Sequence, residues 1–371
     1  MTSKRISILL VNPSSETAGC RLRWLNIKDL RSQDNKYTVH TVHLPDAAEL
    51  ISANGSFLSR LPYINNVIRK ISYKIRSLLA VVKIARAGVV VFGKPYNHGH
   101  IQAMRTARRF NAKIISDFCD FHSSSFSAFH VAAGLSDVIS APTMLLSTRI
   151  TSETGKQVDV IPDYIDYQIL ALCHDLPNTS NTSNVDPRKQ SILWFGLGFS
   201  SGKPTRSFEL FCRLISASAD VLSRCNISIE ILSENVLLAA SYLKASMVDC
   251  KHLDCKSVQW SPAAMANALR SPGFAIIPYP EPVIACEKSP NRIELALYEG
   301  KVVISNGKHL PSLDPELASY VRDLPMHSLS PNDLLFLEDR QEHQIVQTRR
   351  YLNAKQFAIN DCWTDLIDRL V

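Results

Sequence analysis

Five polar side chains with useful chemistry crowd into six residues before a predicted helix in the second half of the chain. They are Glu287, Lys288, Ser289, Asn291 and Arg292. A helix N-terminus carries partial positive charge and free N–H groups, and neighbouring cations strengthen its hold on an anion. Such a site stabilises a departing diphosphate. We therefore predict that Lys288 and Arg292 act in catalysis. We also predict that Glu287, Ser289 and Asn291 bind the substrate that carries the diphosphate, which we call the donor. The alternative is a solvated loop in which Ser289 only caps the helix.

A glycine-rich turn is the second feature with possible chemistry. The predicted strand 191–196 runs into Gly196, Gly198 and Gly202 before a helix. A backbone without side chains can approach phosphates closely, and Lys203 or Arg206 would add positive charge. We assign Gly196, Gly198 and Lys203 to the donor site. The spacing is one residue longer than the dinucleotide-binding pattern, so an ordinary tight turn is the alternative.

Acidic and imidazole groups follow a buried strand in the first half, in the segment SDFCDFH. The carboxyl ends of parallel strands form the ligand edge of an open α/β sheet. We predict that Asp120 and His122 act in acid–base chemistry or bind substrate hydroxyls, and that Asp117 is a structural cap. A metal site is a further alternative. His98 and His100 follow the preceding strand, either lining the same edge or serving as ordinary loop residues.

Two series of alternating strands and helices position these groups. The pattern predicts an α/β protein with two Rossmann-like, doubly wound domains facing across a cleft. The predicted strands are 5–11, 37–44, 88–94, 113–119, 137–140, 157–163, 191–196, 227–233, 257–260, 274–279 and 301–306. A segment rich in Asn, Ser, Thr and Pro at 176–190 predicts the linker. The predicted domains are then 1–175 and 191–345, with helices in 346–371 crossing back onto the first domain.

The last predicted helix has one apolar stripe. This stripe contains Phe357, Ile359, Trp363, Leu366, Ile367 and Leu370. A stripe of this kind must be buried against another element, and we expect that element to be the first domain.

Length and composition support a folded, two-domain enzyme. The chain has 371 residues, of which 46% are hydrophobic and 20% charged. This length exceeds the usual size of a single core. The apolar run near the N-terminus is too short for a signal peptide or a membrane span, which predicts a cytoplasmic protein.

A basic amphipathic helix is predicted within 59–88. This stretch contains no acid and carries Arg60, Arg69, Lys70, Lys74, Arg76, Lys83 and Arg86. Apolar residues recur between them at helical spacing: Ile68, Ile71, Ile75, Leu78, Leu79 and Val82. One interpretation is a helix packed on its own domain with a solvated basic face. The other is peripheral contact with an anionic membrane surface at its inner face. No recognition motif accompanies the charges, so we predict no nucleic-acid partner.

Several segments resemble the GT-B glycosyltransferases, especially the retaining group that builds bacterial surface polysaccharides. ILWFGLGFSSGKPTRSFEL, SVQWSPAAMANALRSPGFAIIPY and EKSPNRIELALYEGKVVIS resemble the family's donor domain, and the first-half strands follow the family's order. The resemblance implies a nucleotide-sugar donor and a glycan or lipid-linked acceptor. It also implies retention of configuration, no tightly bound cofactor and no metal. In the segment SSETAGCRLRW, similar to the acceptor-side loop, Arg21 and Arg23 would meet a phosphate or remain surface charges.

The donor motif departs from that family pattern. The retaining group has two glutamates eight positions apart, of which the second contacts the ribose. Here Glu287 and Glu294 are seven apart, and Leu295 stands at the expected place. We assign Glu294 to the donor site as the nearest candidate. The donor base stays open, and a CMP-Kdo-type transferase is one alternative.

Three other functions remain compatible with the sequence. A nicotinamide-dependent oxidoreductase would use the Gly196 turn, with Glu234 closing the next strand to hold a ribose. A non-catalytic binder would bind a nucleotide sugar without turnover. A sugar-nucleotide epimerase of the same fold would release free nucleotide and a new free sugar.

Overall fold

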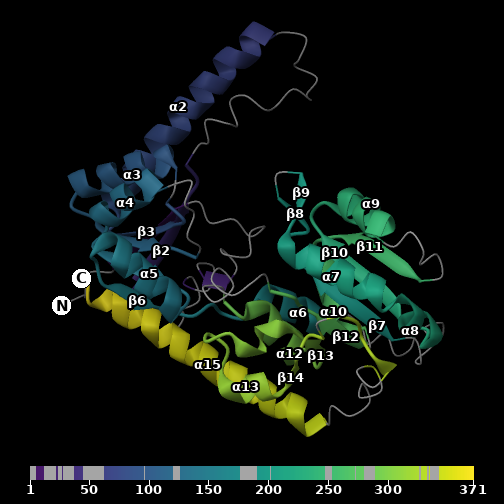
Figure 1. Cartoon of the computed structure of the whole chain (residues 1–371). Helices are drawn as coiled ribbons and strands as arrows, with labels where there is room; N and C mark the ends of the chain where they lie inside the picture. The colour runs from purple at the N-terminus through teal and green to yellow at the C-terminus, as the bar shows by residue number, and fades with distance from the viewer. Residues whose placement is uncertain are drawn as a thin grey trace. The chain divides into compact units, whose positions relative to one another are not determined.

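The computed structural model divides the chain into two compact domains (Figure 1). The first contains Met1–Tyr164 and Phe357–Val371, and the second contains Ile165–Gln356. The structure describes residues 6–11, 22–23, 27, 37–44, 62–95, 97–119, 126–175, 190–200, 202–246, 253–271, 273–279, 289–325, 327–331, 334 and 342–371.

The first domain is built on a six-stranded parallel sheet with the order β2-β1-β3-β4-β5-β6. The strands are β1 (Ile6–Val11), β2 (Tyr37–Val42), β3 (Val89–Gly93), β4 (Lys113–Asp117), β5 (Val138–Ala141) and β6 (Val158–Val160). β1 pairs with β2 on one side and β3 on the other, so Ile8 lies between Val39 and Val89. The strand order therefore reverses between β1 and β3. Every residue of β3 is buried, as expected for a parallel strand covered on both faces.

Helices cover both faces of this sheet. They are α2 (Pro62–Arg86), α3 (His98–Arg109), α4 (Phe126–Leu135), α5 (Met144–Thr154) and α15 (Glu342–Asp368). Met104 of α3 and Phe129 of α4 pack with Phe92 in the core on one face. The end of α15 packs in the core on the other face, with Trp363 fully buried beside β-strand residues such as Leu10. The predicted return of the last helix to the first domain is confirmed.

One residue of the predicted apolar stripe on this helix was placed wrongly. Ile359, Trp363, Leu366 and Ile367 are buried in the first domain, whereas Phe357 is 67% exposed. Six residues of helix separate Phe357 from Trp363, which turns it roughly 120° away from that side chain.

The second domain repeats the architecture with a six-stranded parallel sheet in the order β11-β10-β7-β12-β13-β14. Its strands are β7 (Ser191–Phe195), β10 (Ser228–Ser233), β11 (Cys255–Gln259), β12 (Gly273–Ile276), β13 (Val302–Ile304) and β14 (Val321–Arg322). Trp194, Phe208 and Phe211 fill the core on one face. Leu193, Met265 and Leu297 belong to the core on the other. The strand order reverses between β7 and β12.

The helices of the second domain connect these strands. They are α6 (Tyr167–Asp175), α7 (Arg206–Ala217), α8 (Ala219–Arg224), α9 (Val236–Ser246), α10 (Pro262–Arg270), α12 (Asn291–Tyr298) and α13 (Pro315–Ser319). α6 packs with α10 and contributes Ile169 and Leu170 to the second core. The division between the domains thus falls before α6, whereas the sequence analysis placed it after that helix. The predicted linker at 176–190 lies outside the described residues except for Gln190.

In the described part of the chain, no helix combines the length and the apolar character that a membrane crossing requires.

A buried lysine makes the stability of the second domain depend on pH. Lys301 is 2% exposed, and its ammonium donates to the carbonyl of Ser271. Burial lowers the pKa of Lys301 to about 8, although Glu230 and Glu299 oppose this shift. The unfolded chain therefore binds more protons between pH 8 and the ordinary lysine pKa of 10.5, so stability rises with pH across that window.

We expect the free energy of unfolding of the wild-type protein to rise relative to Lys301→Met by about 2–3 kcal/mol between pH 8 and 10.5. Urea denaturation of both proteins at several pH values measures this difference. Parallel stability curves for the two proteins would contradict the assignment.

Candidate functional site

The candidate site lies where the strand order of the second sheet reverses. β7 and β12 are neighbours there, with Leu193 paired to Ala275. The chain leaves β7 through Phe195 and Gly196 and leaves β12 through Ile277 to Tyr279. Ligands of open α/β sheets bind at this edge because the adjacent connections run to opposite faces and leave room between them.

Arg292 occupies this edge from the first turn of α12. Its Nη1 donates to the carbonyl of Phe195 at 3.1 Å, and its Cζ lies 5.2 Å from the centroid of the Tyr279 ring. These two contacts hold the guanidinium plane in one orientation. A guanidinium has five N–H donors in a fixed fork, so a plane anchored through one of them can present others to a phosphate.

Tyr279 is itself held by the loop after β13. The side chain of Asn306 accepts from the Tyr279 N–H at 2.7 Å and donates to the Tyr279 carbonyl at 2.9 Å. A Cβ on Gly307 would lie 2.6 Å from Cε2 of the tyrosine ring, so only glycine allows this approach. Burial raises the pKa of Tyr279 despite the opposing charge of Arg292, so the hydroxyl stays neutral.

These three supporting residues were not among the predicted site residues. Tyr279 and Asn306 were the last residues of two predicted strands, and Gly307 follows the second of them. The Asn-Gly pair after KVVIS was the available signal, because such pairs mark a turn.

The glycines after β7 are required by close approaches. Gly196 has φ 150°, and a Cβ there would lie 2.8 Å from Nη1 of Arg292. A Cβ on Gly198 would lie 2.7 Å from Oγ of Ser233, at the end of β10. The structure thus brings Gly196 and Arg292 together, although they are far apart in sequence.

The rest of the glycine segment does not form a turn leading straight into a helix. β8 (Phe199–Ser200) and β9 (Lys203–Pro204) form an antiparallel hairpin, with Gly202 at φ 76°. Lys203 is exposed on this hairpin. α7 then begins after Thr205, whose hydroxyl caps the helix by accepting from Phe208 N–H. The hairpin and the cap therefore separate the glycines from the N-terminus of α7.

The N-terminus of α12 is a better candidate for an anion site than the N-terminus of α7. The cap residue of α12 is Pro290, whose side chain makes no capping hydrogen bond. Ser289 precedes this proline, so the alternative in which Ser289 caps the helix is wrong. Ser289 and Asn291 are both half-buried at this terminus. A helix N-terminus favours an anion, and a proline cap supplies no side-chain acceptor that would compete with one. Glu287 and Lys288 lie outside the described residues.

Glu294 lies on the opposite side of α12 from Arg292. Its side chain is fully buried and forms an ion pair with Nζ of Lys355 on α15. Two residues of helix turn a side chain by about 200°, so one ligand cannot engage Arg292 and Glu294 from the same face of the helix. The surroundings of Glu294 therefore do not support the ribose contact that the sequence suggested.

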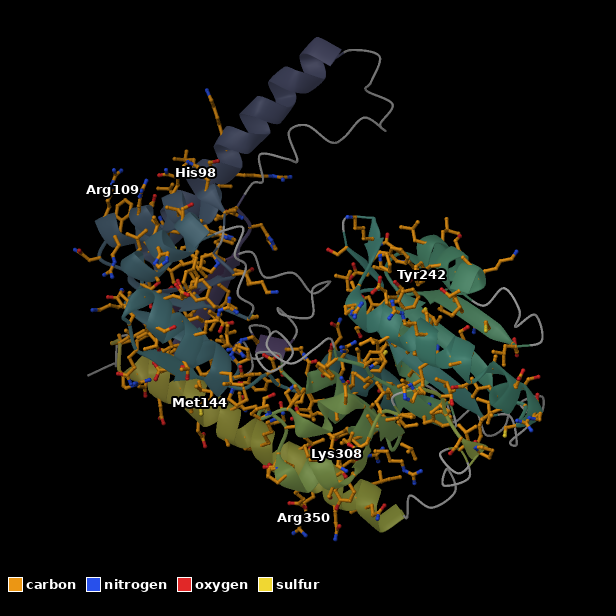
Figure 2. All side chains as sticks on the ribbon, in the orientation of Figure 1. His98, Arg109, Met144, Tyr242, Lys308 and Arg350 are labelled. Carbon is orange, nitrogen blue, oxygen red and sulfur yellow. The ribbon has the colours of Figure 1, made fainter. Side chains whose placement is uncertain are left out.

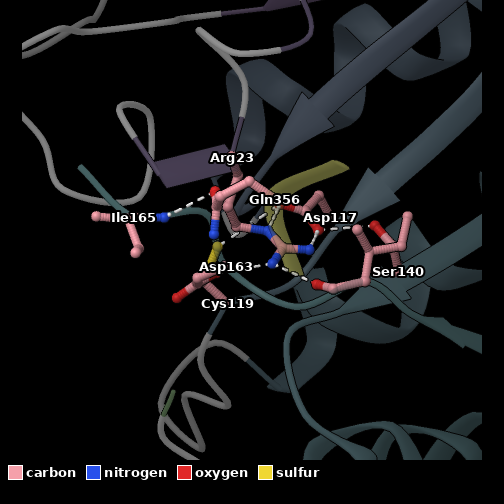
Figure 3. Close-up of polar contacts among 8 residues, drawn as sticks. Arg23, Asp117, Cys119, Ser140, Asp163, Ile165 and Gln356 are labelled. Carbon is pink, nitrogen blue, oxygen red and sulfur yellow. Dashed lines mark hydrogen bonds and ion pairs between the residues drawn. The ribbon is translucent and has the colours of Figure 1, made fainter. Parts of the chain in front are cut away.

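A second polar cluster lies at the carboxyl edge of the first sheet (Figure 3). Arg23 forms a bidentate ion pair with Asp117, with Nε to Oδ2 at 2.6 Å and Nη2 to Oδ1 at 2.7 Å. Its Nη1 donates to Oδ1 of Asp163 at 2.8 Å and to the carbonyl of Ile161 at 2.7 Å. Ser140 donates to Asp117 at 2.7 Å. The Arg23 guanidinium thus ties the end of β4 to the segment after β6, and Ser140 of β5 joins the network through Asp117.

This cluster is structural. Arg23 and Asp117 are both 0% exposed, so neither can bind a phosphate from solution. The expected phosphate or surface role of Arg23 is wrong, because two carboxylates hold it in the interior. Burial and the Asp117 charge raise the pKa of the Cys119 thiol, which donates to Asp117 at 3.6 Å.

The other candidate site residues of the first domain are two histidines on α3 and two residues after β4. Asp120 and His122 lie outside the described residues, so their roles stay predictions. His98 and Arg109 mark the two ends of α3 in Figure 2. His98 is exposed, whereas His100 is buried edge-on against Phe92 at 6.3 Å. Within the described ranges, no three His, Cys, Asp or Glu side chains are grouped as metal ligands.

Comparison with known proteins identifies the fold. No family model matches the chain, and no curated protein matches it in sequence. Solved structures match it along almost its whole length. A UDP-GlcNAc 2-epimerase from Neisseria meningitidis bound to UDP-GlcNAc has a TM-score of 0.55 and 11% identity, covering 98% of this chain and 100% of its own. A UDP-forming α,α-trehalose-phosphate synthase from Burkholderia xenovorans has a TM-score of 0.56 and 10% identity, covering 99% and 98%.

An E. coli trehalose-6-phosphate structure bound with UDP-2-fluoro glucose is similar at a TM-score of 0.57 and 10% identity, covering 98% of both chains. Identities this low show the fold alone. The chain has the GT-B fold with two Rossmann-like domains, as the sequence predicted.

Proposed function

We propose that the second domain binds the diphosphate of a nucleotide sugar at Arg292 and that the protein transfers the sugar to an acceptor. The observation that carries this proposal is the placement of Arg292. Its guanidinium is bonded to the Phe195 carbonyl and packed on Tyr279, beside the N-terminus of α12. A preorganised cation at the strand-order reversal suits an anionic ligand.

The proposed roles in sugar transfer follow from the negative charge that develops on the departing nucleotide. The bond between the anomeric carbon and the diphosphate oxygen breaks, and negative charge grows on the departing nucleotide. Arg292 and the first-turn N–H groups of α12 stabilise that charge, and we propose Lys288 as a second cation. Gly196 leaves the space that the Arg292 guanidinium occupies. Ser289 and Asn291 are proposed as further donor contacts.

The acceptor half of the reaction is also a proposal. The acceptor hydroxyl forms a new bond to the anomeric carbon and loses its proton. In a retaining reaction the departing phosphate takes that proton on the same face of the sugar, and this needs no metal. Asp120 and His122 are proposed to bind the acceptor or assist the proton transfer. The acceptor class is a glycan or a lipid-linked sugar of a surface polysaccharide or glycoconjugate.

UDP-sugars are the first donors to test. Two of the similar structures, the epimerase with UDP-GlcNAc and the E. coli protein with UDP-2-fluoro glucose, contain uracil nucleotides by their descriptions. The CMP-linked alternative stays open because the position of the family's ribose glutamate is taken by Leu295, which is buried in the second core.

A sugar-nucleotide epimerase is the second candidate function. The similarity to a UDP-GlcNAc 2-epimerase along the whole chain favours it. An epimerase would use the same diphosphate site at Arg292 but would need no acceptor. Inverting a carbon centre breaks its C–H bond, so the new proton comes from an exchangeable source.

A ligand screen followed by product analysis tests the proposal. Thermal shift across UDP-, GDP-, ADP-, dTDP- and CMP-sugars and NAD(P) identifies the nucleotide, because ligands that bind the folded state raise the melting temperature. Turnover in D₂O then separates the functions. A transferase joins the sugar to an acceptor without deuterium at C2, whereas a 2-epimerase incorporates deuterium there.

Three results would contradict the transferase proposal. A nicotinamide cofactor that alone stabilises the protein would indicate an oxidoreductase. Binding without turnover against an acceptor panel would indicate a sugar-nucleotide binder. No shift with any nucleotide sugar would overturn the diphosphate site itself.

A further inference from the structure

The helix α2 is held to the first domain by one narrow face. The structure describes its side chains from Lys74 to Arg86. Ala80 and Ile84 are 2% and 1% exposed and pack with Leu9 and Val42 of the first sheet. Their spacing of four residues places them one above the other on the same side of the helix.

The main apolar stripe of α2 lies on the other side. Ile75, Leu78, Leu79 and Val82 are 53%, 64%, 56% and 39% exposed. At 100° per residue these four side chains fall within an arc of roughly 100°, whose centre lies roughly 170° from the buried pair. These four residues of the predicted stripe therefore do not build the core of the domain.

Basic residues flank this exposed stripe. Lys74, Arg76, Lys83 and Arg86 are all exposed, and residues 59–88 contain seven Lys or Arg and no Asp or Glu. The Nζ of Lys83 donates to the Thr41 carbonyl at 2.9 Å. Lys74 lies on one flank of the stripe, Arg76 and Lys83 lie on the other, and Arg86 lies at its C-terminal end. Such a stripe is complementary to a bilayer surface with anionic headgroups, because the stripe enters the acyl boundary and the cations meet phosphates.

We propose that α2 docks the protein on an anionic phospholipid surface through Ile75, Leu78, Leu79 and Val82. Soluble proteins rarely leave a contiguous row of large aliphatic side chains in water, so the stripe needs a partner. The uniform positive charge along the helix selects anionic lipid as that partner. The proposal does not depend on the proposed function, since docking requires no nucleotide.

Vesicle flotation with the full chain tests the docking. Vesicles of phosphatidylcholine alone are compared with vesicles that also contain phosphatidylglycerol, at low and high salt. We expect at least about tenfold tighter binding to the anionic vesicles, and weaker binding as salt screens the charges. Leu78→Ser with Leu79→Ser should reduce binding at least about tenfold. Lys74→Gln with Arg86→Gln should reduce it about tenfold as well.

Leu237→Ser is the matched control. Leu237 is an 80% exposed leucine on α9 of the second domain, so its replacement should leave vesicle binding unchanged. Circular dichroism confirms that each variant is folded. Equal binding to neutral and anionic vesicles, or binding unaffected by the Leu78 and Leu79 changes, would overturn the proposal. So would an absence of vesicle binding together with self-association lost in the leucine variant, because the stripe would then be a protein contact.

Discussion

Replacing Arg292 with alanine is expected to lower kcat/KM for the nucleotide sugar by about 100- to 1000-fold. The guanidinium is the one described cation anchored at the strand-order reversal, by the Phe195 carbonyl and the Tyr279 ring. Its loss removes stabilisation of the charge that grows on the departing diphosphate. Steady-state kinetics and nucleotide titration by calorimetry measure the effect on turnover and on binding.

Two further substitutions distinguish the contribution of the positive charge of Arg292 from the contribution of its exact position. Arg292→Lys keeps the charge but loses the planar fork, so we expect a smaller loss of activity than with alanine. Gly196→Ala should also lower activity, because its Cβ would lie 2.8 Å from Nη1 of Arg292. Gly202→Ala is the matched control. It also has a positive φ, at 76°, but no atom lies within 4 Å of the added Cβ, so only backbone strain is introduced.

A distant arginine controls for general loss of charge. Arg224 is exposed on α8 and donates to the Asp220 carbonyl. Arg224→Ala should leave kcat/KM within twofold or so of the wild type, as surface changes usually do. If Arg292→Ala behaved like Arg224→Ala in a correctly folded protein, the diphosphate site would have to lie elsewhere.

Replacing Arg23 with methionine is expected to destabilise the first domain by about 3–5 kcal/mol. Arg23 is the partner of two carboxylates, Asp117 and Asp163, and is 0% exposed. Removing it leaves both acids in the interior without their cation. Burial alone would lower the pKa of Arg23, but Asp117 and Asp163 raise it overall, so the guanidinium is charged whenever the domain is folded.

Hydrogen exchange measures the loss of stability in the first domain by itself. The slowest amides of β4 and β5 report opening of the first sheet separately from the second domain. Arg369→Met is the control, because Arg369 pairs with Asp159 at 2.9 Å in a partly exposed position. That pair should contribute less than about 1 kcal/mol. Replacing Arg23, Asp117 and Asp163 together by uncharged residues should recover part of the lost stability. Equal destabilisation by the Arg369 and Arg23 changes would contradict the buried network.

Much of the fold was readable from local patterns. Short β-branched runs separated by amphipathic helices predicted eleven of the twelve parallel strands in the two sheets, since side-chain period reflects backbone geometry. The two-residue strand β14 was not predicted. The stripe around Trp363 predicted a final helix that returns to the first domain. Arg292 could be assigned to an anion site because its position before an apolar helical pattern marked a helix N-terminus.

The faces of helices were harder to predict. Periodicity gives the angle between two side chains on one helix but says nothing about which neighbour lies on each side. Arg292 and Glu294 are both close to the start of α12, yet the first faces Phe195 and the second pairs with Lys355. On α2 the small Ala80 and the single Ile84 face the core, while the larger stripe through Leu78 and Leu79 is exposed.

The amino-acid sequence by itself therefore determined the alternation of strands and helices in two α/β domains, an amphipathic last helix and a cationic helix terminus, because each depends on residues close together in the chain. The tertiary structure alone decided the partners of the charged groups. Arg23 meets Asp117 and Asp163 across 94 and 140 positions of sequence. Gly196 meets Arg292, and Tyr279 meets Asn306, only because β7, β12 and β13 end at one edge of the sheet. Such contacts depend on strand order, which no local pattern encodes.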